Sequence, residues 1–243
     1  MIGIKEARAR CVILGPMKKT QEWPVEVEVR RTGDMLPGDL CLPEGARGLV
    51  IFAHGSGSSR LSPRNRMVAE ALCSAGLATL LFDLLTPREA ADRRNVFDIP
   101  LLAERVTDAI AWARHDPDVS SLPLGLFGAS TGAAAALVAA AAEPEAVGAV
   151  VSRGGRPDLA DGALGAVRAP TLLIVGGNDF GVIELNEAAF ARLRCPKRLE
   201  IVPGATHLFE EPGALEEVVR LATDWFLRHL SAERGDQAAP RAR

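Results

Sequence analysis

Apolar and polar positions follow two kinds of strand pattern along this chain. Residues 25–29 (VEVEV) alternate strictly, which is typical of a strand that buries one face. Residues 48–53 (GLVIFA) are instead almost continuously apolar, as strands are when both faces are covered. Segments such as 63–75 place apolar residues at helical spacing. The chain is therefore predicted to begin with an antiparallel pair and to continue with alternating strands and helices.

The same patterns predict each element in turn. We expect strands at 25–29, 34–42, 48–53, 78–85, 122–127, 147–152, 171–175 and 199–202, and helices at 63–75, 101–115, 133–142, 183–193 and 212–230. Residues 86–100 are expected to form a charged loop, and Asp158–Val167 has room for only a short helix. Eight strands with crossover helices predict an α/β fold, with a mostly parallel sheet between two helical layers.

The expected domain organisation is simple. Residues 23–231 form one domain, which is a common size for a single α/β unit. An irregular segment, 1–22, precedes it. A polar and flexible tail, 232–243, follows it.

Composition excludes several classes of function. The net charge of −3 gives no electrostatic reason to expect a nucleic acid or an anionic membrane as partner. The first ten residues lack the apolar core of a signal peptide, and no apolar run is long enough to span a bilayer. We therefore expect a cytoplasmic protein, and the sequence leaves homo-oligomerisation open.

The cysteines also favour a location in the reducing cytoplasm. Cys11, Cys41, Cys73 and Cys195 are far apart and form no Cys-x-x-Cys pair. This spacing argues against a structural zinc site and a dense disulfide scaffold, and it fits reduced thiols. No metal and no organic cofactor are expected.

The candidate chemistry centres on Gly128-Ala129-Ser130-Thr131-Gly132. This Gly-x-Ser-x-Gly lies between a predicted strand and a predicted helix, which is the context of a nucleophile elbow. The turn is too tight for side chains at its flanks, so glycines stand two residues either side of the serine. Ser130 is the predicted nucleophile.

A serine nucleophile needs a base, and histidine is the usual one. His115 and His229 fall at helix ends and His54 precedes the serine, whereas His207 lies in the loop after the last strand. We therefore expect His207 to be the base.

The base needs a carboxylate to fix its tautomer. Asp179 directly follows a buried strand and completes the order Ser, Asp, His that this motif uses. Glu184 and Asp161 are weaker candidates because neither ends a strand. An Asx turn or a helix N-cap is the alternative role for Asp179.

Two backbone N–H groups are needed to hold a tetrahedral oxyanion. We expect them to come from Thr131 and from Ser56, in the loop His54-Gly55-Ser56-Gly57. This loop lacks the pattern of a nucleotide-binding loop. Asp83, at the end of a strand, is expected to organise it.

Two further residues are candidates for contact with substrate. His54 ends a strand in the oxyanion loop, and Arg153 ends another beside the predicted cleft. Arg153 could bind an anionic group of the substrate or form a salt bridge with a neighbouring loop.

Taken together, the elbow, the His54–Gly57 loop, Asp179 and His207 resemble the α/β-hydrolase family over residues 23–231. Within it, the chain is similar to the dienelactone hydrolase-like group and to hydrolase domains fused to phosphoribosyltransferases. The resemblance implies the eight-stranded fold and Ser–His–Asp acyl transfer. Dienelactone hydrolases proper carry cysteine where this chain has Ser130, which puts dienelactone itself in doubt as the substrate. The family often inserts a cap after the strand that ends at Arg153, and the short segment 154–169 predicts a minimal cap and an open cleft.

The resulting hypothesis is a serine hydrolase that cleaves small carboxylic esters or lactones. A thioesterase, an acyltransferase or a peptidase could use the same triad. A non-catalytic member that binds a small molecule is the alternative from a different class, although such members usually lose a triad residue.

Overall fold

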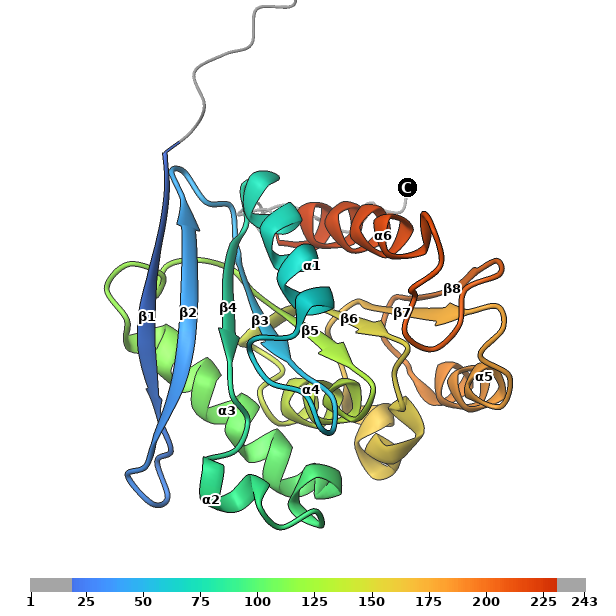
Figure 1. Ribbon diagram of the computed structural model, residues 1–243, viewed down its shortest axis with the longest axis horizontal. Coiled ribbons are helices and arrows are strands. Elements are labelled where there is room, and N and C mark those ends of the chain that lie inside the picture. The colour runs from blue at the N-terminus through green and yellow to red at the C-terminus, as the bar shows by residue number, and fades with distance from the viewer. Residues whose placement is uncertain (1–18, 231–243) are drawn as a thin grey trace, which may run out of the picture.

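The computed structural model describes residues 19–230, which form one sheet between two layers of helices (Figure 1). The strands are β1 (Thr20–Glu28), β2 (Met35–Pro43), β3 (Leu49–Ala53), β4 (Ala78–Phe82), β5 (Leu124–Ala129), β6 (Val147–Arg153), β7 (Thr171–Gly176) and β8 (Lys197–Val202). The α-helices are α1 (Pro63–Ser74), α2 (Pro87–Ala90), α3 (Ile99–His115), α4 (Thr131–Ala142), α5 (Val182–Arg192) and α6 (Ala214–His229). Two 3₁₀ helices, η1 (Asn95–Phe97) and η2 (Pro157–Ala166), complete the set.

The strand order β1-β2-β4-β3-β5-β6-β7-β8 determines where functional loops can meet. The first two pairings in this order, β1 with β2 and β2 with β4, are antiparallel, and all later ones are parallel. The loops that follow β3, β5, β6, β7 and β8 therefore leave the same edge of the sheet. In such sheets this carboxyl edge is where ligands bind.

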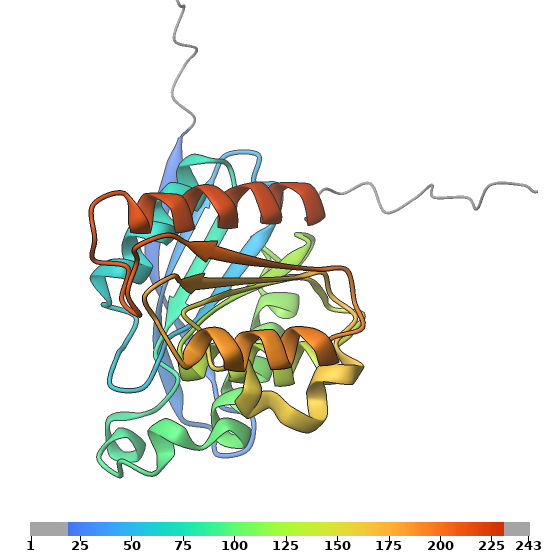
Figure 2. The same cartoon turned by 90° about the vertical axis from the view of Figure 1, so that its right-hand side faces the viewer.

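Each face of the sheet has its own apolar core. Helices α1 and α6 pack on one face, against side chains such as Phe52 and Phe127. Helices α3, α4 and α5 cover the other face, where Leu126 and the alanines of α4 are buried (Figure 2). Small residues in α4 let this helix approach the sheet closely, and the central strands are buried along their whole length.

The eight strands and the three-layer arrangement confirm the predicted fold. Several boundaries shift by a few residues, and two differences are larger. Strand β1 begins at Thr20, so it takes the last residues of the segment expected to be irregular, because its pairing with β2 extends that far. The expected charged loop 86–100 contains α2 and η1, since Thr86 and Glu89 form a reciprocal cap that starts α2. The irregular segment up to residue 18 and the tail 232–243 lie outside the described residues.

The expectation of reduced thiols is wrong for two cysteines. A disulfide joins Cys41 in β2 to Cys73 in α1, and Cys195 is free and buried. Cys41 pairs with Thr79 in β4, and α1 leads directly into β4. Topology thus brings together two cysteines whose separation in sequence gave no sign of it.

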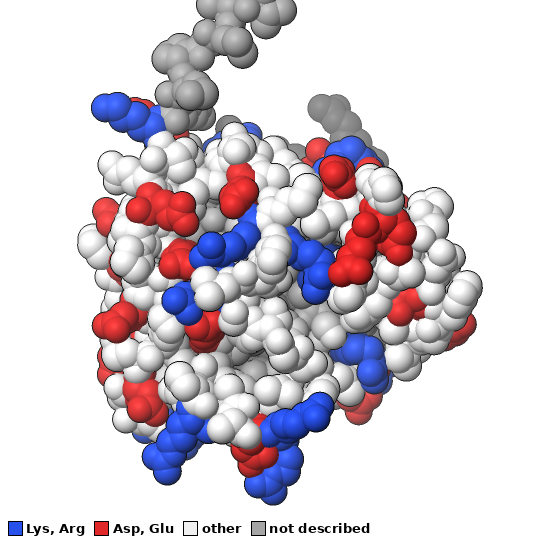
Figure 3. Space-filling model, viewed as in Figure 1, with Lys and Arg blue, Asp and Glu red and all other residues white. Residues whose placement is uncertain are grey.

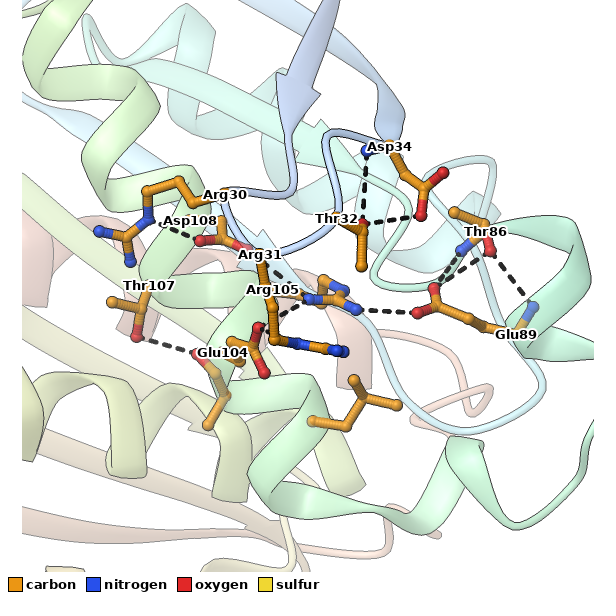
Figure 4. A network of polar contacts seen from close by, with 12 residues as sticks. Arg30, Arg31, Thr32, Asp34, Thr86, Glu89, Glu104, Arg105, Thr107 and Asp108 are labelled. Atoms are coloured by element: carbon orange, nitrogen blue, oxygen red, sulfur yellow. Dashed lines mark hydrogen bonds and ion pairs between the residues drawn. The ribbon is translucent and has the colours of Figure 1, made fainter.

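A buried ionic network ties α2 and α3 to the turn after β1 (Figure 4). The side chain of Arg105 in α3 is fully buried, and its Nη2 donates to Oε1 of Glu89 at 2.8 Å. Asp108, one turn further along α3, accepts from Nε of Arg30 at 2.7 Å. Because a buried charge is costly unless it is paired, the contact of Glu89 with Arg105 fixes the 86–98 segment on α3.

None of the helices between residues 19 and 230 is long and apolar enough to cross a membrane.

Glu89→Gln should lower the free energy of unfolding by roughly 1–3 kcal/mol, because it removes the carboxylate nearest to the buried Arg105. Burial acts to raise the pKa of Glu89, but hydrogen bonds from Thr86 and Arg105 outweigh it, so the pKa is lowered. A lowered carboxyl pKa stabilises the fold above the unfolded value of about 4.5, and this contribution is lost as pH falls through the folded value. The melting temperature of Glu89→Gln should therefore be lower than that of wild type at pH 7, and the difference should shrink below about pH 4.5. Glu145→Gln, at an exposed ion pair, is the control, and equal melting temperatures for Glu89→Gln and wild type at pH 7 would contradict this role.

Candidate active site

Ser130 occupies a strained turn between β5 and α4. Its φ of 52° and ψ of −122° lie where non-glycine residues are rarely found. The strain is maintained by the elements on either side, since β5 ends at Ala129 and α4 begins at Thr131. The sequence expectation of an elbow at this position agrees with this backbone geometry.

The glycines of the motif are required by close contacts. A Cβ at Gly132 would overlap the carbonyl oxygens of Ala53 and His54, at the end of β3. A Cβ at Gly128 would overlap the backbone of Ala133 in α4. Gly55 plays the same part from the opposite loop, since its Cβ would lie 2.9 Å from Cβ of Ser130. The turn therefore has no room for side chains beside Ser130.

The structure brings His207 and Asp179 together. Nδ1 of His207 donates to Oδ2 of Asp179 at 2.7 Å, across a separation of 28 residues. The loops that carry them are joined by Asn178, whose N–H donates to Ala205 and whose Nδ2 donates to Gly204. With its proton on Nδ1, a neutral His207 presents Nε2 as an acceptor.

Ser130 and His207 line the same cavity, of about 270 Å³. Of the other carboxylates considered, Asp161 forms an ion pair with Arg192 at the surface instead, and Glu184 is in the first turn of α5. Ser130, His207 and Asp179 thus come from three loops at one edge of the sheet.

Ser56 and Thr131, the two residues expected to supply oxyanion donors, are in contact, and one of the two N–H groups already donates a hydrogen bond within the protein. The N–H of Ser56 donates to Oγ1 of Thr131 at 2.9 Å. Thr131 is the first residue of α4, so its own N–H has no acceptor within that helix. The sequence placed these N–H groups side by side but could not reveal the hydroxyl contact between them.

Hydrogen bonds place His54 in support of the oxyanion loop. Its Nε2 accepts from the N–H of Leu84 at 3.1 Å, and its Nδ1 lies 3.0 Å from the carbonyl oxygen of Gly55. Nδ1 therefore carries the proton, and burial lowers the pKa of the ring, which keeps it neutral. Both ring nitrogens are used within the protein, which favours a positioning role over the substrate contact expected from sequence.

Asp83 binds Arg60, at the far end of the loop that follows β3. Its carboxylate accepts from the N–H of Arg60 at 2.7 Å and from Nη1 of Arg60 at 2.6 Å. These contacts agree with the expectation that Asp83 organises the loop after β3.

Arg153 lies in the wall of the cavity that contains Ser130, and the residue is only 7% exposed. The expected alternative of a salt bridge is wrong, because no carboxylate among the described residues pairs with it. Its Nη2 donates instead to Oδ1 of Asn65 at 3.3 Å. Burial, together with the charge of Arg64, lowers the pKa of Arg153 to about 10, so the side chain is still charged at neutral pH.

Sequence reasoning missed Arg64 and Asn65, which also line this cavity. The pattern of α1 predicted that the helix begins at Pro63, but nothing in it indicated that this end meets the site. No group of metal-ligating side chains is present within residues 19–230.

Known proteins share this architecture. A sequence model of the family described as "Alpha/beta hydrolase domain" matches residues 46–218. Two Mycobacterium tuberculosis proteins, provisionally named phosphoribosyl transferases, are 62% identical over 205 residues, which is 84% of this chain and 46% of theirs. The chain thus spans about half the length of these curated relatives.

The chain is also similar to proteins of known structure. A crystal structure of dienelactone hydrolase from Anabaena variabilis is 59% identical, with a TM-score of 0.84, and the match covers 87% of this chain and 99% of that one. Est1E from Butyrivibrio proteoclasticus, at 17% identity, has a TM-score of 0.72, over 85% of this chain and 98% of its own, and shows the fold alone.

Gly132→Ala should destabilise the fold or prevent folding, because the added Cβ overlaps two carbonyl oxygens at the end of β3. We expect a loss of at least about 3 kcal/mol, measured by denaturant unfolding. Gly162→Ala is the matched control, since a Cβ there meets nothing within 4 Å. Equal stability of the two variants would show that the helix can move away from β3, and that the turn is less constrained than described.

Proposed function

Because this chain belongs to the alpha/beta hydrolase family, we propose that it is a serine hydrolase that cleaves small carboxylic esters or lactones. The observation that carries the proposal is the 2.7 Å contact between His207 and Asp179 beside the elbow serine. Similarity to the dienelactone hydrolase from Anabaena variabilis supports an ester or a cyclic ester as the substrate.

The proposed reaction begins with attack of Ser130 Oγ on the ester carbonyl while Nε2 of His207 takes the serine proton. Asp179 holds the imidazole and stabilises its charge as the imidazolium forms. His207 then returns the proton to the leaving alcohol, and an acyl group remains on Ser130. Water, activated by His207, releases the acid and restores the enzyme.

The oxyanion is proposed to bind the N–H groups of Thr131 and Ser56. The macrodipole of α4 favours negative charge at its N-terminus, where Ser130 and Thr131 lie. Since the Ser56 N–H donates to Oγ1 of Thr131 in the free protein, the oxyanion must share or replace that contact.

A second cavity offers room for an apolar group. It measures about 470 Å³ and is lined by Leu84, Leu85, Val96 and Leu102, on the side of the oxyanion loop that faces α2. It shares Gly55, Ser56 and Ser58 with the cavity of Ser130. We propose that this cavity limits the size of the apolar part of the substrate.

The name of the Mycobacterium tuberculosis relatives suggests a different reaction. The match covers 84% of this chain, whose residues 46–218 fit the alpha/beta hydrolase family, but only 46% of each relative. We assign the transferase activity in that name to the half of those proteins that this chain does not cover.

Thioesterase, acyltransferase and peptidase reactions use the same residues, so only a substrate panel separates them. A module that binds without catalysis differs in one respect, because its serine is not activated. A fluorophosphonate probe should label Ser130 in a hydrolase and leave a pure binding module unlabelled.

Ser130→Ala should abolish hydrolysis of p-nitrophenyl acetate, with kcat falling by at least about 1,000-fold, because the nucleophile is removed. Ser120→Ala, at an exposed position away from the site, is the control and should keep full activity. Activity of Ser130→Ala close to that of wild type would reject the proposed nucleophile.

Asp179→Asn should lower kcat by roughly 10³–10⁴-fold while the fold persists, because the amide no longer stabilises the imidazolium or fixes the tautomer. Asp161→Asn is the control, since that carboxylate pairs with Arg192 at the surface. Initial rates on the same ester decide the matter, and equal losses in both variants would remove Asp179 from the mechanism.

A further inference from the structure

The cavity that contains Ser130 is unusually basic for the cleft of an acidic protein. Arg64 and Arg153 line it, together with Asn65, Ser58 and Ser62, and none of its described lining residues is acidic. Figure 3 shows basic side chains gathered in the middle of the face over α1, beside a hollow in the surface. The positive charge is thus concentrated where a substrate would enter.

Arg153 carries a buried charge with no protein counter-ion. It is 7% exposed, its Nε has no hydrogen-bond partner, and its one side-chain bond goes to the neutral amide of Asn65. Burial of a guanidinium without a carboxylate is costly, so such groups are normally paired. An unpaired one in a cleft indicates a site where a ligand supplies the missing negative charge.

Arg64 adds a second guanidinium to the same wall. Its Nη1 pairs with Glu210 at 3.0 Å, whereas its Nε is buried without a partner. The charge of Arg64 is close enough to Arg153 to disfavour the protonated form of Arg153. Two like charges that face one cavity repel each other unless an anion lies between them.

We propose that Arg153 and Arg64 bind a phosphate group carried by the substrate, so that the enzyme prefers phosphorylated esters. This assignment rests on the proposed hydrolase function. A carboxylate can be satisfied by the fork of one guanidinium, whereas a phosphate monoester has three oxygens and about two negative charges to distribute. Two guanidinium groups, with the hydroxyls of Ser58 and Ser62 on the same wall, suit the phosphate better.

Because Arg153 lies close to Ser130 in the fold, a phosphate bound by Arg153 is expected to belong to the ester substrate itself. Arg153 ends β6 and pairs with Ala129, the residue before the nucleophile, and its carbonyl oxygen accepts from the N–H of Ser130. Ser130 and Arg153 line one cavity of about 270 Å³, so an anion held by Arg153 and an ester at Ser130 can belong to one small molecule. Its contact with Arg153 would orient the ester toward Ser130.

The test compares three acetate esters that differ in one terminal group, namely 2-acetoxyethyl phosphate, 3-acetoxypropanoate and 2-methoxyethyl acetate. Wild-type kcat/KM should be about 10–100 times higher for the phosphate ester than for the neutral ester, as expected for charge-assisted hydrogen bonds of 1.5–3 kcal/mol. In Arg153→Gln the ratio should fall to about one, and in Arg64→Gln it should fall in part. Arg168→Gln, at an exposed ion pair remote from the cavity, should keep the wild-type ratio.

Inorganic phosphate provides a readout that does not depend on phosphorylated substrates. It should inhibit hydrolysis of the neutral ester competitively in wild type, and more weakly in Arg64→Gln, which tests the site even if Arg153→Gln fails to fold. A wild-type ratio near one, a ratio retained in Arg153→Gln, or equal rates for the carboxylate and phosphate esters would overturn the phosphate assignment. Hydrolysis of the neutral ester tests the hydrolase function separately, so loss of the preference alone leaves that function standing.

Discussion

The close approach of α4 to the end of β3 is the constraint on which the site depends. Gly132 lies against the carbonyl oxygens of Ala53 and His54, and nothing larger than hydrogen fits there. This contact places the first turn of α4 against the oxyanion loop, where Oγ1 of Thr131 meets the N–H of Ser56. It also leaves Ser130 in a backbone conformation that the residue would not adopt alone. The packing of one helix end thus positions both Ser130, the proposed nucleophile, and the proposed oxyanion donors.

Among the residues that the structure describes, most of the charged groups around this end of α4 are paired with an opposite charge, but one is not. Asp179 stands opposite His207, and Asp83 stands opposite Arg60, so these pairs are complete within the protein. Arg153 faces the same cavity, and its partners, the amide of Asn65 and the ring of Phe209, carry no negative charge. The paired groups hold loops in place, whereas the unpaired one is available to a ligand. This contrast separates residues that build the cleft from a residue that can select what enters it.

Local patterns were sufficient to predict most of the fold, because strands and helices in an α/β sheet are distinguished by where their apolar residues recur. The eight strands follow from them, and so do the positions of Ser130, Asp179 and His207 at one edge. The short helix α2 escaped prediction because it depends on the cap between Thr86 and Glu89 and on an ion pair with Arg105, not on an apolar face. The disulfide between Cys41 and Cys73 escaped because only strand pairing reveals that they are neighbours.

The same limit applies to the site. Arg64 and Asn65 belong to it through the direction in which α1 points, which no spacing in the sequence encodes. His54 was placed in the site by its position after β3, but its hydrogen bonds to Leu84 and Gly55 could be seen only in three dimensions.

The proposed role of Ser130 as a covalent nucleophile can be tested by trapping the acyl-enzyme intermediate. The protein is quenched with acid during turnover of a p-nitrophenyl ester, and its peptides are analysed by mass spectrometry. Covalent catalysis by Ser130 should leave the acyl group on this residue, and turnover with the acyl group on another residue, or on none, would contradict the mechanism.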